Sequence, residues 1–384
     1  MLRTPRATLI VATIAYVLGI TAQNTYLFFV APIALAQHGA QTWGPLVFAG
    51  SALATMLAVV PAGQLADRYP RRRVMRAGLA LLALAYVPVL LDASAPRGEI
   101  IASILSGTGL ALLIVSFNSY VADLLAASEM SSAYGRAGAV AILGSASGPF
   151  VGALVFHLAP TPAIGLVVCC VLFGLAGVGG MLLSLALPTQ ARLAADDVPA
   201  RPAAKSPVLA VSFLYVLVGV SFGLTTPYFA QYFLEWLSFS PESWGYLLAA
   251  GTVASAGAFL VSGALGRRFP MTKLLLGGQA LAALATLPFL LPLAAVALGA
   301  TYVARTFLAN GFSPLINALM MSRVPASRRG VAQGWTSAAW NAGWAVGALA
   351  GGALLARWGG GAFVAGGTIG LIGAVVGVTM LRRG

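Results

Sequence analysis

Long apolar runs alternate with short polar segments along the whole chain. Each run can cross the hydrocarbon core of a membrane as a helix, which takes roughly 20 residues. Glycine and proline within the runs fit this assignment, because neighbouring helices satisfy the backbone groups that they free. The twelve runs lie near residues 8–36, 43–66, 74–91, 99–122, 134–157, 162–187, 207–235, 242–265, 273–292, 295–320, 331–356 and 360–381. The pattern therefore predicts an all-α membrane protein with twelve transmembrane helices.

One polar stretch divides these runs into two sets of six. Residues 188–206 contain three prolines and five charged residues. Such a composition is typical of a linker between bundles. We therefore expect an N-terminal six-helix bundle over 1–187, a cytoplasmic linker over 188–206 and a C-terminal six-helix bundle over 207–384.

The two halves share a pattern of glycines at an offset of 199 residues. The first set is Gly135, Gly144, Gly148 and Gly152, and the second is Gly334, Gly343, Gly347 and Gly351. Residues 63–70 align with 263–270 at nearly the same offset. A repeat of this length means that one half of the protein is a copy of the other, a plan on which many transporters are built. The two bundles are expected to be pseudo-symmetric.

Composition and charge agree with a membrane location. Hydrophobic residues make up 59% of the chain and charged residues 8%, whereas soluble domains carry roughly 25% charge. The net charge of +13 does not indicate nucleic-acid binding, because 19 of the 22 lysine and arginine residues fall on one predicted side. By the positive-inside rule, both termini are expected in the cytoplasm, and the membrane is expected to be the inner one.

Two motifs resemble those of a known family. The segment from Gly63 to Arg73, GQLADRYPRRR, resembles the signature loop of the major facilitator superfamily, with Pro70 in place of the usual glycine. The pattern from Gly135 to Gly152 resembles the fifth-helix motif of twelve-span drug–proton antiporters in that superfamily, with Ala153 replacing its final glycine. The resemblance implies two bundles that carry a small molecule by alternating access.

The resemblance also implies a charged latch at the cytoplasmic edge of the membrane. In that family, an acid in the signature loop, an acid that ends span four and an arginine near span eleven form such a cluster. Partly buried charge pairs suit a two-state latch, because breaking one partner away is costly. The matching residues here are Asp67, Arg68, Asp123 and Arg329. We interpret Arg71 to Arg73 as topology signals rather than as parts of the latch.

The glycine rows predict close helix approach. Positions four apart stay on one helix face, so each row forms a groove without side chains. A proline within the first row should bend that helix. The resemblance places these helices at the interface between the halves, so we expect the rows to be the surfaces on which the halves meet. These interface residues are Gly144, Gly148, Pro149, Gly152, Gly343, Gly347 and Gly351.

Arg305 is the most informative single residue. It lies within span ten with apolar sequence on both sides, and a charged residue there should face a cavity or a partner. Two interpretations remain open: Arg305 binds an anionic group of a substrate, or it pairs with Glu235 near the outer end of span seven. The other predicted substrate-binding residues are polar or aromatic groups on spans that line the cavity in this superfamily: Gln23, Asn24, Tyr26, Tyr228, Gln231, Asn310, Trp340, Asn341 and Trp344.

No acidic residue lies in the middle of a predicted span. Many drug–proton antiporters carry a deep carboxylate in the N-terminal half, and the sequence shows none at such a position. Proton coupling would then have to use Glu235, Asp123 or the histidines His38 and His157, and Glu235 is our candidate.

The leading hypothesis is a secondary transporter that exports drug-like or amphipathic compounds by proton antiport. The alternative is a sugar or organic-anion carrier, a symporter or uniporter, that uses Arg305 and the cavity amides. A non-transporting membrane receptor is a third hypothesis, although the longest loop, 188–206, leaves little room for an extramembrane domain. No motif of an enzyme or an ATP site is found, so we expect no catalysis, no cofactor and no bound metal. The expected partners are the small-molecule substrate, protons and the lipid bilayer, and the chain is expected to be a monomer.

Overall fold

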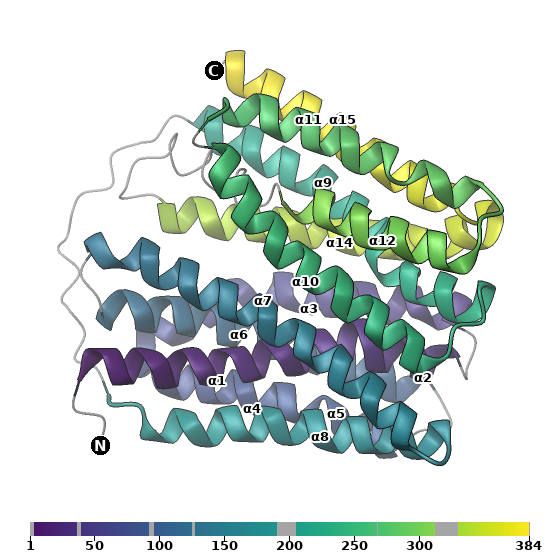
Figure 1. Ribbon diagram of the computed structural model, residues 1–384. Coiled ribbons are helices and arrows are strands. Elements are labelled where there is room, and N and C mark those ends of the chain that lie inside the picture. Colours follow the sequence, from purple (N-terminus) through teal and green to yellow (C-terminus); the bar gives the residue numbers. More distant parts are fainter. Residues whose placement is uncertain are drawn as a thin grey trace. The chain divides into compact units, whose positions relative to one another are not determined.

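The chain folds into helices that follow the predicted spans. The computed structural model describes residues 4–36, 40–91, 96–124, 127–189, 205–266, 268–311 and 329–383. Within these ranges the regular elements are all helical, as Figure 1 shows. Each of the twelve predicted spans has a helical counterpart. Ten are long and apolar enough to cross a membrane by length and composition. The remaining two predicted spans correspond to α12 (Ala295–Asn310) and α14 (Arg329–Trp358). The predicted all-α membrane fold is confirmed.

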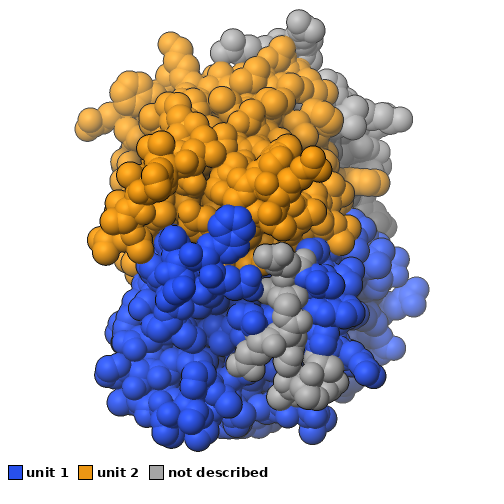
Figure 2. Space-filling model, turned by 90° about the vertical axis from the view of Figure 1, so that its right-hand side faces the viewer, with its two compact units in different colours: residues 1–196, 233–249 blue, residues 197–232, 250–384 orange. Residues whose placement is uncertain are grey.

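Two compact units make up the chain, and Figure 2 colours them separately. Unit 1 comprises residues 1–196 together with 233–249, and unit 2 comprises 197–232 together with 250–384. Most of the predicted linker, residues 190–204, lies outside the described part of the chain. The first part of α10 (Pro241–Gly266) belongs to unit 1, although the sequence assigns this helix to the second half.

The helices of the N-terminal half are as follows: α1 (Pro5–Thr25), η1 (Tyr26–Val30), α2 (Ala31–Ala36), α3 (Ala40–Arg68), α4 (Arg71–Leu84), α5 (Tyr86–Leu91), α6 (Arg97–Leu124), α7 (Ala127–Leu158), α8 (Pro162–Leu183) and η2 (Ser184–Ala186). Thr4 caps α1 by accepting a hydrogen bond from the amide of Ala7, and Thr161 caps α8 in the same way. In both cases a proline follows the cap, where its missing N–H costs nothing.

The helices of the C-terminal half repeat this order: α9 (Lys205–Gln231), η3 (Tyr232–Trp236), α10 (Pro241–Gly266), α11 (Met271–Leu284), η4 (Leu287–Leu290), α12 (Ala295–Asn310), α14 (Arg329–Trp358) and α15 (Gly361–Arg383). Pro70 and Pro270 precede α4 and α11 at equivalent positions. The sequence repeat is therefore also a repeat of elements.

Large apolar side chains cover the outside of the helices. Leu57, Leu260 and Val296 expose 69%, 76% and 84% of their surface. Aromatic residues such as Tyr26 and Phe229 are instead fully buried. This distribution suits a bilayer, because lipid tails solvate apolar side chains and helix packing drives association.

A π-helical turn ends the first helix of each half. The turn η1 follows α1, and η3 follows α9 at the equivalent place. Such turns interrupt the regular ladder of backbone hydrogen bonds and often occur at functional sites. In unit 1, the indole Nε1 of Trp244 in α10 donates to the carbonyl of Phe28 in η1, with a distance of 3.1 Å.

The glycine rows pack against a helix of their own unit. A Cβ atom at Gly144 would lie 2.5 Å from Val17 of α1. In α14, a Cβ at Gly343 or Gly347 would collide with the backbone of α9. The rows do allow close helix approach, but the helix that occupies each is α1 or α9. The expectation that the rows are the surfaces on which the two halves meet stays a prediction.

Candidate functional site

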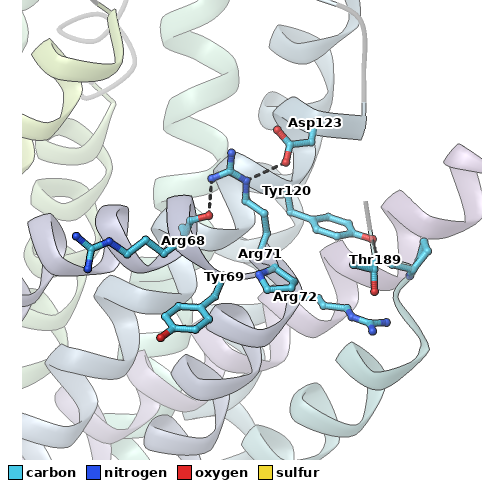
Figure 3. A pocket seen from close by; sticks show the side chains of 10 residues that line it. Arg68, Tyr69, Arg71, Arg72, Tyr120, Asp123 and Thr189 are labelled. Carbon is cyan, nitrogen blue, oxygen red and sulfur yellow. Dashed lines mark hydrogen bonds and ion pairs between the residues drawn. The ribbon is translucent and has the colours of Figure 1, made fainter. Parts of the chain in front are cut away.

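A polar pocket lies in unit 1 where α3 ends, α4 begins and α6 ends. Its volume is about 200 Å³. Figure 3 shows the side chains around it. The lining residues are Ala66, Arg68, Tyr69, Pro70, Arg71, Arg72, Tyr120, Asp123, Pro188 and Thr189. The pocket thus combines the signature loop, the end of span four and the start of the predicted linker.

Arg71 is the central side chain of this pocket. Its Nε donates to Oδ2 of Asp123 at 2.8 Å, and its Nη1 donates to Oδ1 of Asp67 at 3.2 Å. The same Nη1 also donates to the carbonyl of Ala66 at 3.0 Å. The side chains of Arg71 and Asp123 expose only 20% and 17% of their surface, whereas that of Asp67 exposes 76%. The bond between Arg71 and Asp123 is therefore the better shielded of the two ion pairs.

The predicted latch residues are only partly brought together. Asp67 and Asp123 share Arg71, which the sequence analysis left out of the latch. The side chain of Arg68 extends away from Asp123 (Figure 3). Arg329 begins α14, and its side chain lies outside the described residues. The signal for Arg71 was its spacing of four from Asp67, which places opposite charges on neighbouring turns.

A second arginine of the pocket holds the chain before the linker. Arg72 donates to the carbonyl of Leu187 at 2.7 Å, and the hydroxyl of Tyr120 donates to the carbonyl of Pro188 at 3.2 Å. These bonds connect α4 and α6 to the segment that leaves α8. The signature loop is thus joined to the point where the first half ends.

Arg305 is the main charged group buried within unit 2. It lies on α12 with 4% of its surface exposed. Its Nη2 donates to the hydroxyl of Thr225 on α9 at 2.8 Å. The guanidinium lies over the rings of Phe222 and Phe229, 5.5 Å and 5.2 Å from their centroids. Both distances are within the range of cation–π attraction. Its Nε has no hydrogen-bond partner among the described residues.

Among the described residues of unit 2, none is acidic. Apart from Asp197, the segments that form unit 2 have no aspartate or glutamate at all. Asp197 belongs to the linker and lies outside the described residues. Glu235 belongs to unit 1 and is exposed. Its pairing with Arg305 stays a prediction.

Aromatic rings from α9 and α14 continue the site beyond Arg305. Trp340 contacts Trp344 and Phe222, with ring centroids 6.1 Å and 5.1 Å apart. Tyr215 meets Trp340 edge to face at 6.2 Å. Trp340 is half-buried and Trp344 buried. Phe222 belongs both to this group and to the surroundings of the guanidinium, so the cation and the rings form one continuous cluster.

The predicted amides are mostly engaged within their own unit. Asn24 donates to the hydroxyl of Ser145 at 2.8 Å, and Asn310 donates to that of Ser255 at 3.0 Å. Asn341 donates to the carbonyl of Ser337 on its own helix at 2.9 Å. Gln23 and Gln231 are buried, with 4% and 6% exposed. The first two of these bonds link α1 to α7 and α12 to α10.

The two predicted tyrosines also bridge helices. Tyr26 donates its hydroxyl to the carbonyl of Glu99 at 2.8 Å. Tyr228 donates to the carbonyl of Ala348 on α14. Both rings are fully buried. Their hydroxyls are engaged with backbone acceptors, as buried polar groups generally are.

The carboxylates differ from expectation. Glu235 is exposed, although its sequence position made it the candidate for proton coupling. Glu99 is instead 1% exposed, although it lies at the third position of α6. Its burial comes from side chains of other helices, which no local pattern reveals. Among the described residues, no three histidine, cysteine, aspartate or glutamate side chains form a group that could hold a metal.

Comparison with known proteins identifies the family. The model of the Major Facilitator Superfamily matches residues 11–336 and 211–384. The chain belongs to this superfamily. A comparison with curated protein sequences gave no match. As a major facilitator protein, the chain is an integral membrane protein of a family whose members transport small molecules.

Solved structures of transporters share the fold. A bacterial homologue of the iron transporter ferroportin aligns with a TM-score of 0.74 at 15% identity, covering 99% of both chains. A bacterial homologue of the human lysosomal transporter Spinster aligns with a TM-score of 0.76 at 16% identity, covering 100% of this chain and 98% of that one. The xylose transporter XylE from E. coli aligns with a TM-score of 0.75 at 14% identity, covering 99% of this chain and 96% of that one. At these identities the similarity shows the fold alone.

Proposed function

We propose that this major facilitator protein carries small amphipathic organic anions across the membrane by alternating access. The buried cation Arg305, for which the described part of its own unit offers no carboxylate, is the observation that carries the proposal. Superfamily membership supports the alternating-access cycle. Together these features favour the organic-anion alternative over a sugar carrier.

The energetics of Arg305 support a ligand with a negative charge. A buried guanidinium loses its hydration, and one hydrogen bond to a neutral hydroxyl replaces little of it. The flanking rings of Phe222 and Phe229 offset part of this cost. A carboxylate or phosphate offers acceptors for the donors that remain, and such charge-assisted bonds are the strong ones. The planar fork of arginine suits these anions better than an ammonium group does.

The aromatic group supports a ligand with an apolar body. Trp340, Trp344 and Phe222 offer flat faces beside the cation. A planar apolar group that packs against these rings can hold its acidic group toward Arg305. An inorganic anion has no apolar group to pack against the rings, and a plain sugar has no negative charge to pair with Arg305.

The pocket around Arg71 supports a conformational role rather than a substrate site. Its ion pairs join the ends of α3, α4 and α6 within one unit. We propose that Arg71, Asp67 and Asp123 form a latch whose strength depends on the state of the transporter. Under the predicted topology this latch lies on the cytoplasmic side.

A matched ligand panel tests the proposal. Aromatic carboxylates such as 2-naphthoate are paired with their neutral amides, and the thermal unfolding of the purified full chain is measured at two pH values. A ligand that prefers the folded state raises the unfolding temperature. We expect stabilisation by carboxylates, weaker stabilisation by amides, and loss of the difference in Arg305→Gln. The exposed Arg357→Gln serves as the matched control.

The result that contradicts the proposal is equal stabilisation by acids and amides, or an unchanged difference in Arg305→Gln. The same panel on Glu235→Gln tests the alternative that this glutamate neutralises Arg305. Under that alternative, its removal increases the binding of carboxylates. Under our proposal, Glu235→Gln behaves like the parent protein.

Export of neutral or cationic drug-like compounds is the second candidate. The half-buried Trp340 beside Trp344 favours it, because these rings can receive an apolar compound without help from Arg305. Expression in a host that lacks its own efflux pumps provides the test. Resistance to several such compounds that survives Arg305→Gln supports this candidate. Unchanged sensitivity across a broad panel, with functional protein in the membrane, rejects it.

A further inference from the structure

An apolar groove lies between α10, α11 and α12 of unit 2, apart from the cluster around Arg305. Its volume is about 260 Å³. Among the described residues that line it, Lys273 is the one that carries a charge, and apolar side chains and glycines make up nearly all of the rest. Val261 and Leu281 of this lining expose 44% and 53% of their surface. The groove is therefore open to the surroundings of the protein rather than sealed in its core.

Helical spacing directs one face of each helix toward the groove. On α11, Lys273, Gly277 and Leu281 are four residues apart and share a face. On α10, the lining residues follow the i, i+3, i+4, i+7 pattern of one face, starting at Ala258. The end of α12 lies against α10, because a Cβ at Gly311 would be 3.3 Å from that of Ala258. The apolar wall extends from Lys273 to Leu281, which is roughly 12 Å along α11.

In unit 1 the equivalent space holds side chains. Leu112 of α6 packs there with Ala62 of α3 in one hydrophobic cluster. The residue 199 positions after Leu112 is Gly311. Gly277 stands 200 positions after Ala77, and a Cβ at Gly277 would meet nothing within 4 Å. The second copy thus lacks two side chains that the first copy has, and the groove is the space that they leave.

The walls of the groove favour an acyl chain. In an integral membrane protein, lipid tails surround the exposed apolar side chains. Water in this groove would find few hydrogen-bond partners. A flexible hydrocarbon chain can instead lie beside Gly277 without burying a polar group. The walls alone accept any lipid tail, so the charge at the end of the groove is what can select among lipids.

Lys273 gives the groove a preference for a negative head group. It is the third residue of α11, is exposed, and has no ion-pair partner among the described residues. The N-terminus of α11 adds partial positive charge at the same place. Arg268, in the turn before this helix, is also exposed. Under the predicted topology this end of the groove lies at the cytoplasmic leaflet, where anionic lipids attract basic residues.

We infer that this groove binds an anionic phospholipid, with an acyl chain between α10 and α11 and the phosphate group beside Lys273. The lipid takes the place of the side chains that fill the same space in unit 1, and it stabilises the packing of α12 against its neighbours. Phe307, which lines the groove, follows Arg305 on α12 by two residues, so the two side chains leave the helix on nearly opposite faces. The lipid thus supports the helix that holds the buried cation. The inference does not depend on the proposed substrate.

Lipid titration of the purified full chain tests the inference. The unfolding temperature is measured in detergent with phosphatidylglycerol, with phosphatidylcholine of the same acyl chains, and with soluble glycerol 3-phosphate. A ligand of the folded state raises this temperature. We expect phosphatidylglycerol to stabilise most, phosphatidylcholine less and glycerol 3-phosphate not at all. Equal stabilisation by the two lipids overturns the inference, and so does stabilisation by glycerol 3-phosphate that matches that of phosphatidylglycerol.

Lys273→Gln tests the recognition of the head group. The titration midpoint for phosphatidylglycerol should shift to a roughly 5-fold higher concentration, the contribution of one basic residue at an anionic membrane surface. The midpoint for phosphatidylcholine should not change. Arg73→Gln is the matched control, because Arg73 is exposed at the equivalent position of unit 1. An unchanged lipid preference in Lys273→Gln, or an equal loss in Arg73→Gln, overturns the inference.

Gly277→Leu tests the place of the acyl chain. The new side chain fills the groove, and the open space at this position allows the variant to fold. We expect it to be at least as stable as the parent protein without lipid and to lose the stabilisation by phosphatidylglycerol. Gly334→Leu, at another helical glycine with nothing within 4 Å, should keep that stabilisation. A full response to phosphatidylglycerol in Gly277→Leu overturns the inference.

Native mass spectrometry of the folded chain provides a second readout. We expect one phosphatidylglycerol to stay bound under activation that removes the other lipids, and to be lost in Lys273→Gln and Gly277→Leu. Removal of all lipids together from the parent protein contradicts the inference. The retained lipid should also remain when 2-naphthoate is added, and its displacement assigns the groove to amphipathic acids instead of lipid. No measurement requires transport, so a failure of the proposed substrate class leaves these results interpretable.

Discussion

The helix pairs α1–α7 and α9–α14 are copies of one another in sequence, yet they pack differently. In α7, Gly144 and Gly148 face side chains of α1, namely Val17, Thr21 and Thr25. In α14, the equivalent Gly343 and Gly347 face the backbone of α9. Contact between α9 and α14 is also far more extensive. The same glycine row therefore meets an adaptable surface in one half and a rigid one in the other.

The reason is visible in the partner helix. On α9, Gly219 and Gly223 meet the carbonyls of Trp340 and Trp344. Small residues thus lie on both sides of this contact, and two backbones can approach. On α1 the facing positions carry β-branched residues, which hold the helices further apart. The comparison teaches that a glycine row permits close approach, whereas the residues opposite determine whether it is reached.

A second difference between the halves concerns charge. The residue of unit 1 that lies 199 positions before Arg305 is Ser106, which is 1% exposed. Conversely, Arg71 of unit 1 aligns with Met271 of unit 2. The N-terminal half has the arginine of the latch, and the C-terminal half has the arginine of the aromatic site. We infer that the two copies have divided conformational control and substrate recognition between them.

Gly347→Ala should produce the largest effect on stability. The new methyl group meets the backbone of α9 at Val220 and Leu224, which no rotamer change relieves. We expect a loss of about 1–3 kcal/mol, the usual cost of overpacking. Thermal unfolding of the purified chain measures it. Gly334→Ala, on the same helix with nothing within 4 Å of the added carbon, should be neutral or stabilising.

Arg71→Met should have the next largest effect. The change introduces the residue found at the equivalent position of unit 2 and leaves Asp123 partly buried without its partner. We expect a loss of about 1–2 kcal/mol, less than for a fully buried pair because water screens part of the interaction. The rate of transport in proteoliposomes should fall even at temperatures at which the variant remains folded. The exposed Arg73→Met is the control, and equal effects of both changes contradict the latch.

Gly148→Ala should have the smallest effect of the three. The added methyl group meets the hydroxyl of Thr25, a side chain that can be removed without disturbing the backbone. We expect a loss below about 1 kcal/mol, because side chains accommodate overpacking better than a backbone does. Thr25→Ala in the same protein should restore the unfolding temperature. If the double variant is no more stable than Gly148→Ala alone, α1 and α7 are as rigidly packed as α9 and α14.

The sequence predicted the helices well because crossing a bilayer depends on apolar length, a local property. It did not predict which helix fills each glycine row, because that depends on the side chains of a distant segment. Arg71 was missed because its charge also fits the positive-inside rule. Glu99 was missed because the end of a span usually meets water, whereas here the side chain is buried and Tyr26 bonds to its carbonyl. Arg305 was found because an arginine within an apolar run has few explanations.

The most direct test of the central claim is the affinity of an aromatic carboxylate for the purified full chain. Calorimetric titration gives this affinity for the parent protein and for Arg305→Lys, Arg305→Gln and Arg357→Gln. Because hydrogen bonds to a charged group contribute about 1.5–3 kcal/mol, we expect Arg305→Gln to weaken binding by roughly 10- to 100-fold. Arg305→Lys keeps the charge but lacks the planar fork of donors, so its affinity should lie between those of the parent protein and Arg305→Gln. Arg357→Gln should bind with the affinity of the parent protein. Equal affinities for the parent protein and Arg305→Gln would contradict the account.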